Sequence, residues 1–125
     1  MKVKIFYHHT DCGGVVYYAN YLKFFEEART ELLAEKGILI KQLIKQGIQF
    51  VVFRQEIDYK SPAFYGDILQ IDTRLINASG IRIEFDYQIR NQNNQIICAG
   101  KTFMACVDTN FKPQVIPPEI QEKLT

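Results

Sequence analysis

NYLKFFEEARTELLAEK, residues 20–36, is the one long stretch whose apolar side chains recur with the three- and four-residue spacing of a helix. Asn20 is a suitable N-cap, and Gly37 supplies the left-handed residue that often ends a helix, directly after Lys36. Because this helix is amphipathic, another element must cover its apolar side. The predicted apolar face consists of Tyr21, Leu22, Phe25, Ala28, Leu32 and Leu33.

Outside this helix most segments alternate between apolar and polar residues, which predicts strands with one buried and one solvated face. The cleanest alternation places Ile81, Ile83, Phe85, Tyr87 and Ile89 on one side. In the strand before Ser61-Pro62, the apolar side chains expected to share a face are Val51, Phe53, Ile57 and Tyr59. The predicted strands run from the N-terminus to about His9, from Gln49 to Lys60, from Asp67 to Ile76, from Ile81 to Arg90 and from Ile96 to Val107. A short helix is expected over Leu39 to Lys45, and a short helix or frayed end over Pro113 to Thr125.

The order of these elements predicts the fold class. Short turns link the last four strands, which favours an antiparallel sheet because parallel strands need long crossovers. We therefore expect an α+β fold in which about five antiparallel strands wrap around one long central helix, with residues 1–125 forming a single domain. Phe50 and Val52 add apolar groups to the second face of a strand that also has an open edge, so we expect another copy of the chain to cover it.

Composition argues against several classes of protein. The chain has 15 Lys and Arg against 14 Asp and Glu, with no basic cluster, so nucleic-acid binding is not expected. Cys12, Cys98 and Cys106 form no C-x-x-C pair, which indicates a reducing compartment. The N-terminal residues lack the apolar core of a signal peptide, and no later run approaches the roughly 18 apolar residues that cross a bilayer. We therefore expect a cytoplasmic protein with no integral membrane segment.

The segment TDCGG, residues 10–14, is the strongest candidate for a functional loop. It combines the carboxylate of Asp11 with two adjacent glycines, which predicts a turn with exposed backbone N–H groups. Tyr7, Tyr17 and Tyr18 are expected to form aromatic walls beside the carboxylate. On residue types alone, the alternative is an aspartate that only caps the turn.

Other kinds of chemistry have less support in the sequence. His8 and His9, adjacent at the end of a predicted strand, are expected to point to opposite faces, so no metal site is expected. No histidine is placed to activate Cys12 as a nucleophile. Gly13-Gly14 does not belong to a phosphate-binding glycine loop, so no nucleotide cofactor is expected.

Residues 7–29 read YHHTDCGGVVYYANYLKFFEEAR and contain T-D-x-x-G-V-V-Y followed by A-N-Y-L-K-F-F-E-x-A-R. Later, Tyr59-Lys60-Ser61-Pro62-Ala63 precedes Gly66-Asp67. With these motifs the chain closely resembles the YbgC-type acyl-CoA thioesterases, in the 4-hydroxybenzoyl-CoA thioesterase-like branch of the hotdog superfamily. The resemblance extends over nearly the full length. It implies the hotdog fold. It also implies assembly into homodimers, or into dimers of dimers that make a homotetramer.

The resemblance also implies an activity, the hydrolysis of an acyl-CoA or acyl-carrier-protein thioester without a cofactor. It places the catalytic carboxylate at Asp11, as general base or nucleophile, and a site-lining tyrosine at Tyr7. We expect Tyr7 and Tyr18 to be catalytic residues that orient Asp11 or the acyl group, and the alternative is that both are only aromatic wall residues. Tyr18 stands where members commonly carry His, and we expect its phenol to donate a hydrogen bond, because a phenol with a reference pKa of about 10 is a poor base. Backbone N–H groups around Gly14 to Tyr17, or at the start of the helix, are expected to polarise the substrate carbonyl. The residues expected to bind substrate are Gly14, Val15, Val16 and Tyr17.

Two other functions stay open at this point. A hotdog hydratase or dehydratase would need an Asp and His pair, and the sequence supplies no such histidine. A non-catalytic acyl-thioester-binding or scaffold protein of lipid or envelope metabolism is compatible with Tyr18 in place of the usual His. In the enzyme, we expect the acyl chain to lie beside the helix, near Phe25 and a partner's strand around Phe50 to Phe53.

Overall fold

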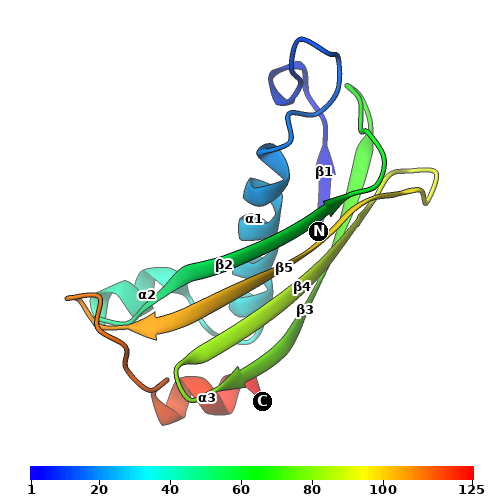
Figure 1. Cartoon of the computed structure of the whole chain (residues 1–125). Coiled ribbons are helices and arrows are strands. Elements are labelled where there is room, and N and C mark those ends of the chain that lie inside the picture. The colour runs from blue at the N-terminus through cyan, green and yellow to red at the C-terminus, as the bar shows by residue number, and fades with distance from the viewer.

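The computed structural model describes all 125 residues (Figure 1). Its five strands form one antiparallel sheet in the order β1-β3-β4-β5-β2, so β2 is an edge strand. α1 packs on this sheet, and the predicted α+β fold is confirmed. No helix is long and apolar enough to span a membrane. The elements are β1 (Lys2–Lys4), the 3-10 helix η1 (Tyr7–His9), α1 (Asn20–Glu35), α2 (Ile40–Lys45), β2 (Gln49–Tyr59), β3 (Ile68–Ser79), β4 (Arg82–Arg90), β5 (Ile96–Val107) and α3 (Pro118–Leu124).

α1 packs on the sheet through a face centred on Phe25, which is fully buried. The Phe25 ring stacks on Tyr87 of β4 with centroids 4.2 Å apart and planes 12° from parallel. Gly100 of β5 makes this approach possible, because a Cβ there would lie 2.7 Å from the Phe25 ring and 2.8 Å from the carbonyl oxygen of Glu56. The residues of α1 that are buried are Tyr21, Phe24, Phe25, Ala28 and Leu33.

One residue of the predicted helix face lies outside it. Leu22 is 39% exposed, whereas Leu32 is partly buried against the core and the unpredicted Phe24 is buried. The predicted N-cap is also wrong, because Ala19 occupies that position and Asn20 is the first helical residue. The Asn20 amide instead donates to the carbonyl oxygen of His9 at 2.8 Å.

The first strand is shorter than the alternation predicts. β1 ends at Lys4, and residues Tyr7–His9 form the 3-10 helix η1 where the strand was expected to continue. The turn forms because the backbone N–H of Phe6 donates to Nδ1 of His9 at 2.9 Å and that of Thr10 donates to the carbonyl oxygen of Tyr7 at 3.0 Å. The prediction that His8 and His9 point to opposite faces is therefore wrong, and their ring centroids lie 4.0 Å apart.

A β-bulge at Phe53 changes the predicted faces of β2. Val52 pairs with Met104 and Arg54 with Phe103, so Phe53 is the extra residue. Before the bulge, Phe50 and Val52 share the face of the buried Met104; after it, the same face carries Ile57 and Tyr59. The prediction that Val51 and Phe53 share a face with Ile57 and Tyr59 is wrong, because one inserted residue reverses a two-residue alternation.

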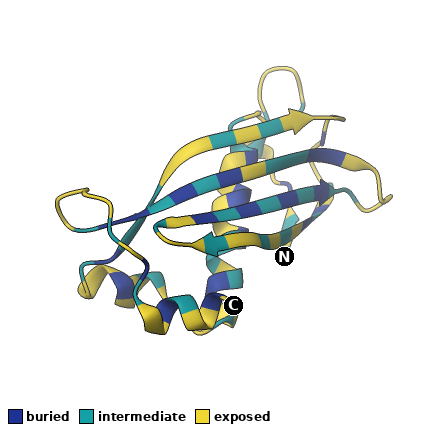
Figure 2. Cartoon of the chain, turned by 60° about the horizontal axis from the view of Figure 1, so that its bottom comes forward, coloured by how far each residue is buried: buried dark blue, intermediate teal, exposed yellow.

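The central strands follow the predicted pattern, and buried positions alternate along β4 (Figure 2). Thr102 of β5 is the one polar or charged residue that is buried as a whole, and hydrogen bonds satisfy its hydroxyl. Tyr87 donates its hydroxyl to Oγ1 of Thr102 at 2.9 Å, and that hydroxyl donates to Oε1 of Gln55 at 2.7 Å. The C-terminal tail is a docked helix rather than a frayed end, because Ile120 and Leu124 of α3 are buried.

Candidate active site

The Asp11 loop, residues 10–16, is a closed turn at the end of the molecule where α1 begins (Figure 1). Thr10 and Val16 form an antiparallel bridge across its base. Within it, the Asp11 N–H donates to the carbonyl oxygen of Val15 at 2.9 Å, and the Gly14 N–H donates to that of Asp11 at 3.1 Å. Gly14 has a φ of +79°, a conformation that side chains rarely tolerate. The loop is therefore ordered by its own backbone.

The Asp11 carboxylate is exposed and only partly engaged. Its Oδ1 accepts a hydrogen bond from the backbone N–H of Gly13 at 2.7 Å. Its Oδ2 makes no hydrogen bond and no ion pair within the chain. One oxygen thus fixes the turn while the other is available to a substrate or a water molecule.

Neighbouring elements hold the loop from two sides. The Val16 N–H donates to the carbonyl oxygen of Ala63, and the Tyr17 N–H to that of His9, each at 2.9 Å. Val15 also forms a bridge with Phe64, in the segment that follows β2. The loop therefore joins η1, α1 and the segment after β2.

The backbone N–H groups of this region differ in availability. Those of Gly14, Val16 and Tyr17, which the sequence suggested as donors to substrate, already donate within the chain. Those of Cys12, Val15, Tyr18 and Ala19 have no acceptor within the chain. The Tyr18 N–H lies just before α1, where the helix dipole also favours negative charge. Val15 and Tyr18 are therefore two of the free donors.

A hollow of about 330 Å³ opens beside these two residues. Tyr18 and Tyr59 form one wall with their rings in a T-shaped arrangement, centroids 6.3 Å apart. The Tyr59 hydroxyl donates to the carbonyl oxygen of Tyr18 at 3.3 Å. Of its lining residues only Lys60 is charged, and the lining consists of Val15, Val16, Tyr18, Tyr21, Tyr59, Lys60, Ser61 and Pro62.

Three phenols and one thiol at or near this hollow, those of Tyr17, Tyr21, Tyr59 and Cys98, have raised pKa values and are protonated near neutral pH. The neighbouring Tyr18 hydroxyl, followed by burial and the Asp11 carboxylate, raises the pKa of Tyr17. Burial is the first cause that raises the pKa values of Tyr21 and Tyr59. Burial also raises the pKa of the Cys98 thiol to about 12. These groups can donate hydrogen bonds but are poor bases or nucleophiles.

The structure brings together part of the predicted site. Val15, Val16 and Tyr18 line one hollow, but Tyr7 is 75% exposed and contacts Tyr65, with ring centroids 6.1 Å apart. Sequence reasoning missed Tyr21 and Tyr59 as wall residues. The Tyr59-Lys60-Ser61-Pro62 motif was the available signal, since three more of its residues line the hollow.

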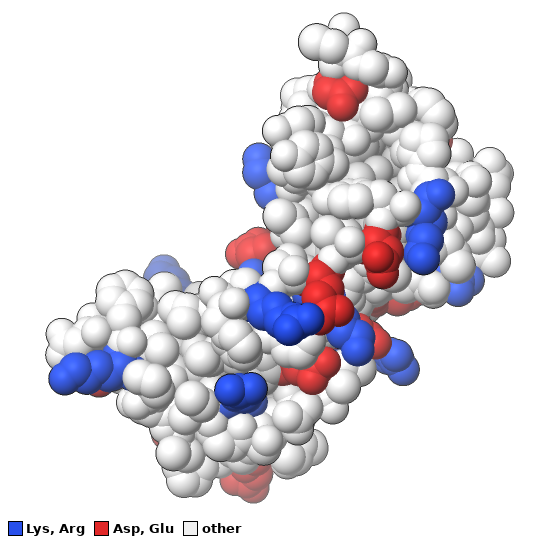
Figure 3. Space-filling view, viewed as in Figure 1, with Lys and Arg blue, Asp and Glu red and all other residues white.

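Charge is sparse around the loop. Between Lys4 and Lys23, Asp11 is the only Asp, Glu, Lys or Arg. The upper part of the space-filling view is correspondingly mostly uncharged, with one isolated acidic patch (Figure 3). No group of three His, Cys, Asp or Glu side chains could hold a metal ion.

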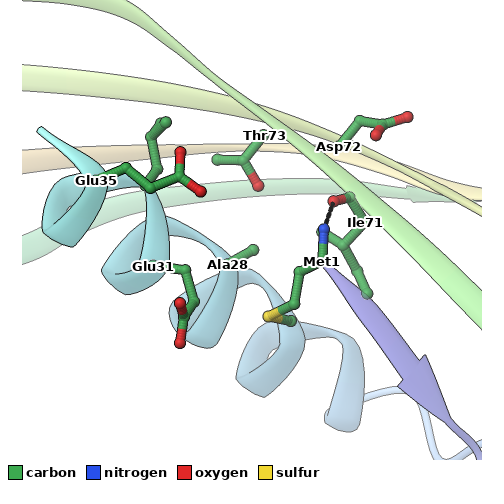
Figure 4. Close-up of a pocket in the computed structure, with 8 residues that line it drawn as sticks. Met1, Ala28, Glu31, Glu35, Ile71, Asp72 and Thr73 are labelled. Carbon is green, nitrogen blue, oxygen red and sulfur yellow. Dashed lines mark hydrogen bonds between the residues drawn. The ribbon is translucent and has the colours of Figure 1, made fainter.

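A second hollow of about 340 Å³ lies between the N-terminus, α1 and β3 (Figure 4). Here the N-terminal ammonium donates to the carbonyl oxygen of Ile71 at 3.1 Å, and Glu35 extends toward Thr73. The Thr73 hydroxyl is buried without a hydrogen-bond partner. None of the Asp11 loop residues reaches this hollow, so it is not part of the candidate active site.

Comparison with known proteins decides the family. The family model described as the thioesterase-like superfamily matches residues 7–124. The chain belongs to this superfamily. The thioesterase is 34% identical over 119 residues to the acyl-CoA thioester hydrolase YbgC of Escherichia coli O6:H1, covering 94% of this chain and 89% of the relative. It is 36% identical over 121 residues to the acyl-CoA thioesterase YbgC of Haemophilus influenzae, covering 95% and 88%.

Solved structures agree with this assignment. A DHNA-CoA thioesterase from Staphylococcus aureus superposes with a TM-score of 0.94 at 28% identity, over 98% of the thioesterase and 85% of that chain. The hypothetical protein TT1821 from Thermus thermophilus gives a TM-score of 0.93 at 26% identity, over 99% and 95%. The predicted resemblance to the YbgC type, the hotdog fold and the activity class of thioester hydrolase are thereby confirmed.

Proposed function

We propose that the chain hydrolyses acyl-CoA thioesters and that Asp11 is the catalytic carboxylate. The observation that carries this proposal is the pairing, within one short ordered loop, of a free carboxylate oxygen with unused backbone N–H donors. Thioester hydrolysis requires both features, an oxygen nucleophile or base and donors for the carbonyl oxygen that gains negative charge. Residues 1–125 would then form one catalytic domain.

In the proposed reaction the thioester carbonyl oxygen accepts hydrogen bonds from the Tyr18 N–H, with the Val15 N–H as a second donor. Asp11 then either attacks the carbonyl carbon or takes a proton from an attacking water molecule. Attack by Asp11 gives a mixed anhydride that a water molecule then hydrolyses, which regenerates the carboxylate. In both routes the C–S bond breaks, the sulfur takes a proton that derives from water and leaves as the CoA thiol, and water supplies the oxygen that the acid product gains. We place the contribution of Tyr18 in its backbone amide, while its phenol and that of Tyr7 shape the site.

Exposed aromatic and aliphatic side chains support a dimer through β2. This edge strand has eleven residues, Gln49–Tyr59, and Val52 and Phe53 on it are about half exposed. An open apolar edge favours pairing with another strand. A second copy placed there would cover the Tyr18 and Tyr59 wall and exclude water from Asp11. Homodimers or dimers of dimers are therefore the proposed assembly, and cytoplasmic localisation stays a prediction from cysteine usage.

Burial and pairing limit which residues are available to contact the acyl group and the CoA phosphates of the substrate. Phe25 is fully buried, so it cannot line an open acyl site within one chain. Among the surface cations on the strands, Arg54 pairs with Glu56, and Arg90 donates to Gln88 and Asn94. Lys60 lines the hollow and makes no ion pair within the chain. We propose Lys60 as a contact for the phosphates of CoA.

The purified chain should be assayed with short aliphatic, aromatic and long acyl groups, each on CoA and on acyl-carrier protein, with release of free thiol as the readout. Turnover on at least one CoA thioester is expected. Turnover only of acyl groups on acyl-carrier protein would mean that the substrate's carrier is that protein and not CoA. Binding without thiol release from any substrate would instead support a non-catalytic acyl-binding or scaffold protein.

A further inference from the structure

His9 connects the two sides of the Asp11 loop. On its N-terminal side it exchanges two hydrogen bonds with Phe6, one from the Phe6 N–H to Nδ1 at 2.9 Å and one from its own N–H to the Phe6 carbonyl at 3.1 Å. On the other side, its carbonyl oxygen accepts from the Tyr17 N–H at 2.9 Å and from the Asn20 amide at 2.8 Å. Asp11 lies between these two attachments in the chain.

The contact with Phe6 requires one protonation state of the imidazole. A backbone N–H can only donate, so Nδ1 must accept and the ring must be neutral with its proton on Nε2. Protonation puts a hydrogen on Nδ1 as well, and the bond to Phe6 is then lost. The ring also packs edge-on against Phe24 of α1, with centroids 5.6 Å apart, so it cannot turn freely to another acceptor.

The groups around His9 favour this neutral state. Burial is the largest cause that lowers the pKa of His9, followed by the positive charge of His8 on η1 and of Lys23 on α1. On the β1 side, Lys4 lies 5.7 Å from the centre of the Phe6 ring. The one acid in the loop is Asp11 itself.

We propose that His9 is a positioning residue for Asp11, whose neutral imidazole closes the turn before the loop and whose protonation releases it. The inference rests on the catalytic role proposed for Asp11. The direction of the pH effect follows from the lowered pKa. The unfolded chain, with a histidine pKa near 6.5, binds the proton more readily than the folded chain. The contact therefore stabilises the fold fully above that pH and is lost as the pH falls through the lower folded-state value.

Three variants separate positioning from general stability. His9→Asn keeps a neutral acceptor at every pH, His9→Phe keeps the ring on Phe24 without an acceptor, and His8→Asn is the control at the exposed neighbour. The kcat/KM of each is compared with that of the parent from about pH 5 to about pH 8. The parent and His8→Asn should lose roughly threefold or more in kcat/KM relative to His9→Asn at the acidic end. The kcat/KM of His9→Phe should be about tenfold below that of His9→Asn at every pH.

A readout that needs no activity completes the test. In NMR spectra, the Phe6 amide of the parent should lose its hydrogen-bonded shift together with His9 protonation, whereas that of His9→Asn should not change. A His9→Asn pH profile that parallels the parent's, or a Phe6 amide that does not respond to His9 protonation, would overturn the inference. Failure of the Asp11 assignment is distinguishable, because the Phe6 amide reports on His9 whichever group performs catalysis.

Discussion

The middle of the helix-sheet interface and the Asp11 loop differ in how many of their polar groups find a partner within one chain and in how far their rings are buried. In the interface, Phe25 stacks on Tyr87, and the polar chain from Tyr87 through Thr102 to Gln55 leaves none of these hydroxyls unpaired. At the loop, a carboxylate oxygen and several backbone N–H donors have no partner within the chain, and several aromatic rings are exposed. The difference indicates that the interface supplies the stability of the fold, while the loop end is left open for substrate and for a second copy of the chain.

Truncation of the central aromatic contact should have the largest effect on stability. Phe25→Ala removes a fully buried ring from the sheet and should lower the free energy of unfolding by about 3–5 kcal/mol. Urea denaturation measures this change. Leu22→Ala, at the exposed residue of the sequence-predicted face, is the control and should change it by less than about 1 kcal/mol. Equal losses in the two variants would mean that α1 does not pack on the sheet through the face centred on Phe25.

A charge on the open edge should have the next largest effect. Phe53→Glu places a carboxylate on the proposed dimer surface and should weaken the dimer by about 2 kcal/mol or more, with a parallel loss of thioesterase activity. Sedimentation velocity and thiol release give the two readouts. Val115→Glu, at a position outside β2 that is 70% exposed, should leave both unchanged. A parent that is monomeric and fully active would contradict the proposed assembly.

Thr102→Val tests the polar chain within the core with little change of shape. It should cost about 1–3 kcal/mol in unfolding free energy, because the hydroxyl of Tyr87 and the amide oxygen of Gln55 both lose a partner. Thr109→Val on the exposed surface should stay within about 0.5 kcal/mol of the parent. If chemical denaturation finds no difference between the two variants, the hydrogen bonds that link Tyr87, Thr102 and Gln55 make no net contribution to stability.

Tyr18→Phe should have the smallest effect, on activity. The variant keeps the backbone N–H proposed to bind the carbonyl oxygen and removes only the phenol, so kcat/KM should fall by less than about threefold. Tyr65→Phe, whose ring contacts Tyr7, serves as a matched control in the same assay. A loss beyond about tenfold for Tyr18→Phe would return the phenol to a direct catalytic role.

Sequence patterns correctly predicted structural features that depend only on residues close together in the chain. The alternation of β4 and the stop of α1 at Gly37, with its φ of +82°, both occur as expected. The bulge at Phe53 and the turn at His9 were missed, since each depends on a hydrogen-bond partner that alternation does not encode. For the site, composition identified the Asp11 loop, but the tertiary hydrogen bonds of Val16 and Tyr17 decide which N–H groups stay free.

The central claim, that chemistry resides in the Asp11 loop while stability resides in the core, is tested most directly by the kcat of Asp11→Asn. Asparagine retains an oxygen that can accept from the Gly13 N–H, so the turn should persist and the unfolding free energy should stay within about 0.5 kcal/mol of the parent. Turnover of the best acyl-CoA substrate should fall by about a hundredfold or more, the scale of a lost general base. Near-parental turnover in a folded Asp11→Asn protein would contradict the account.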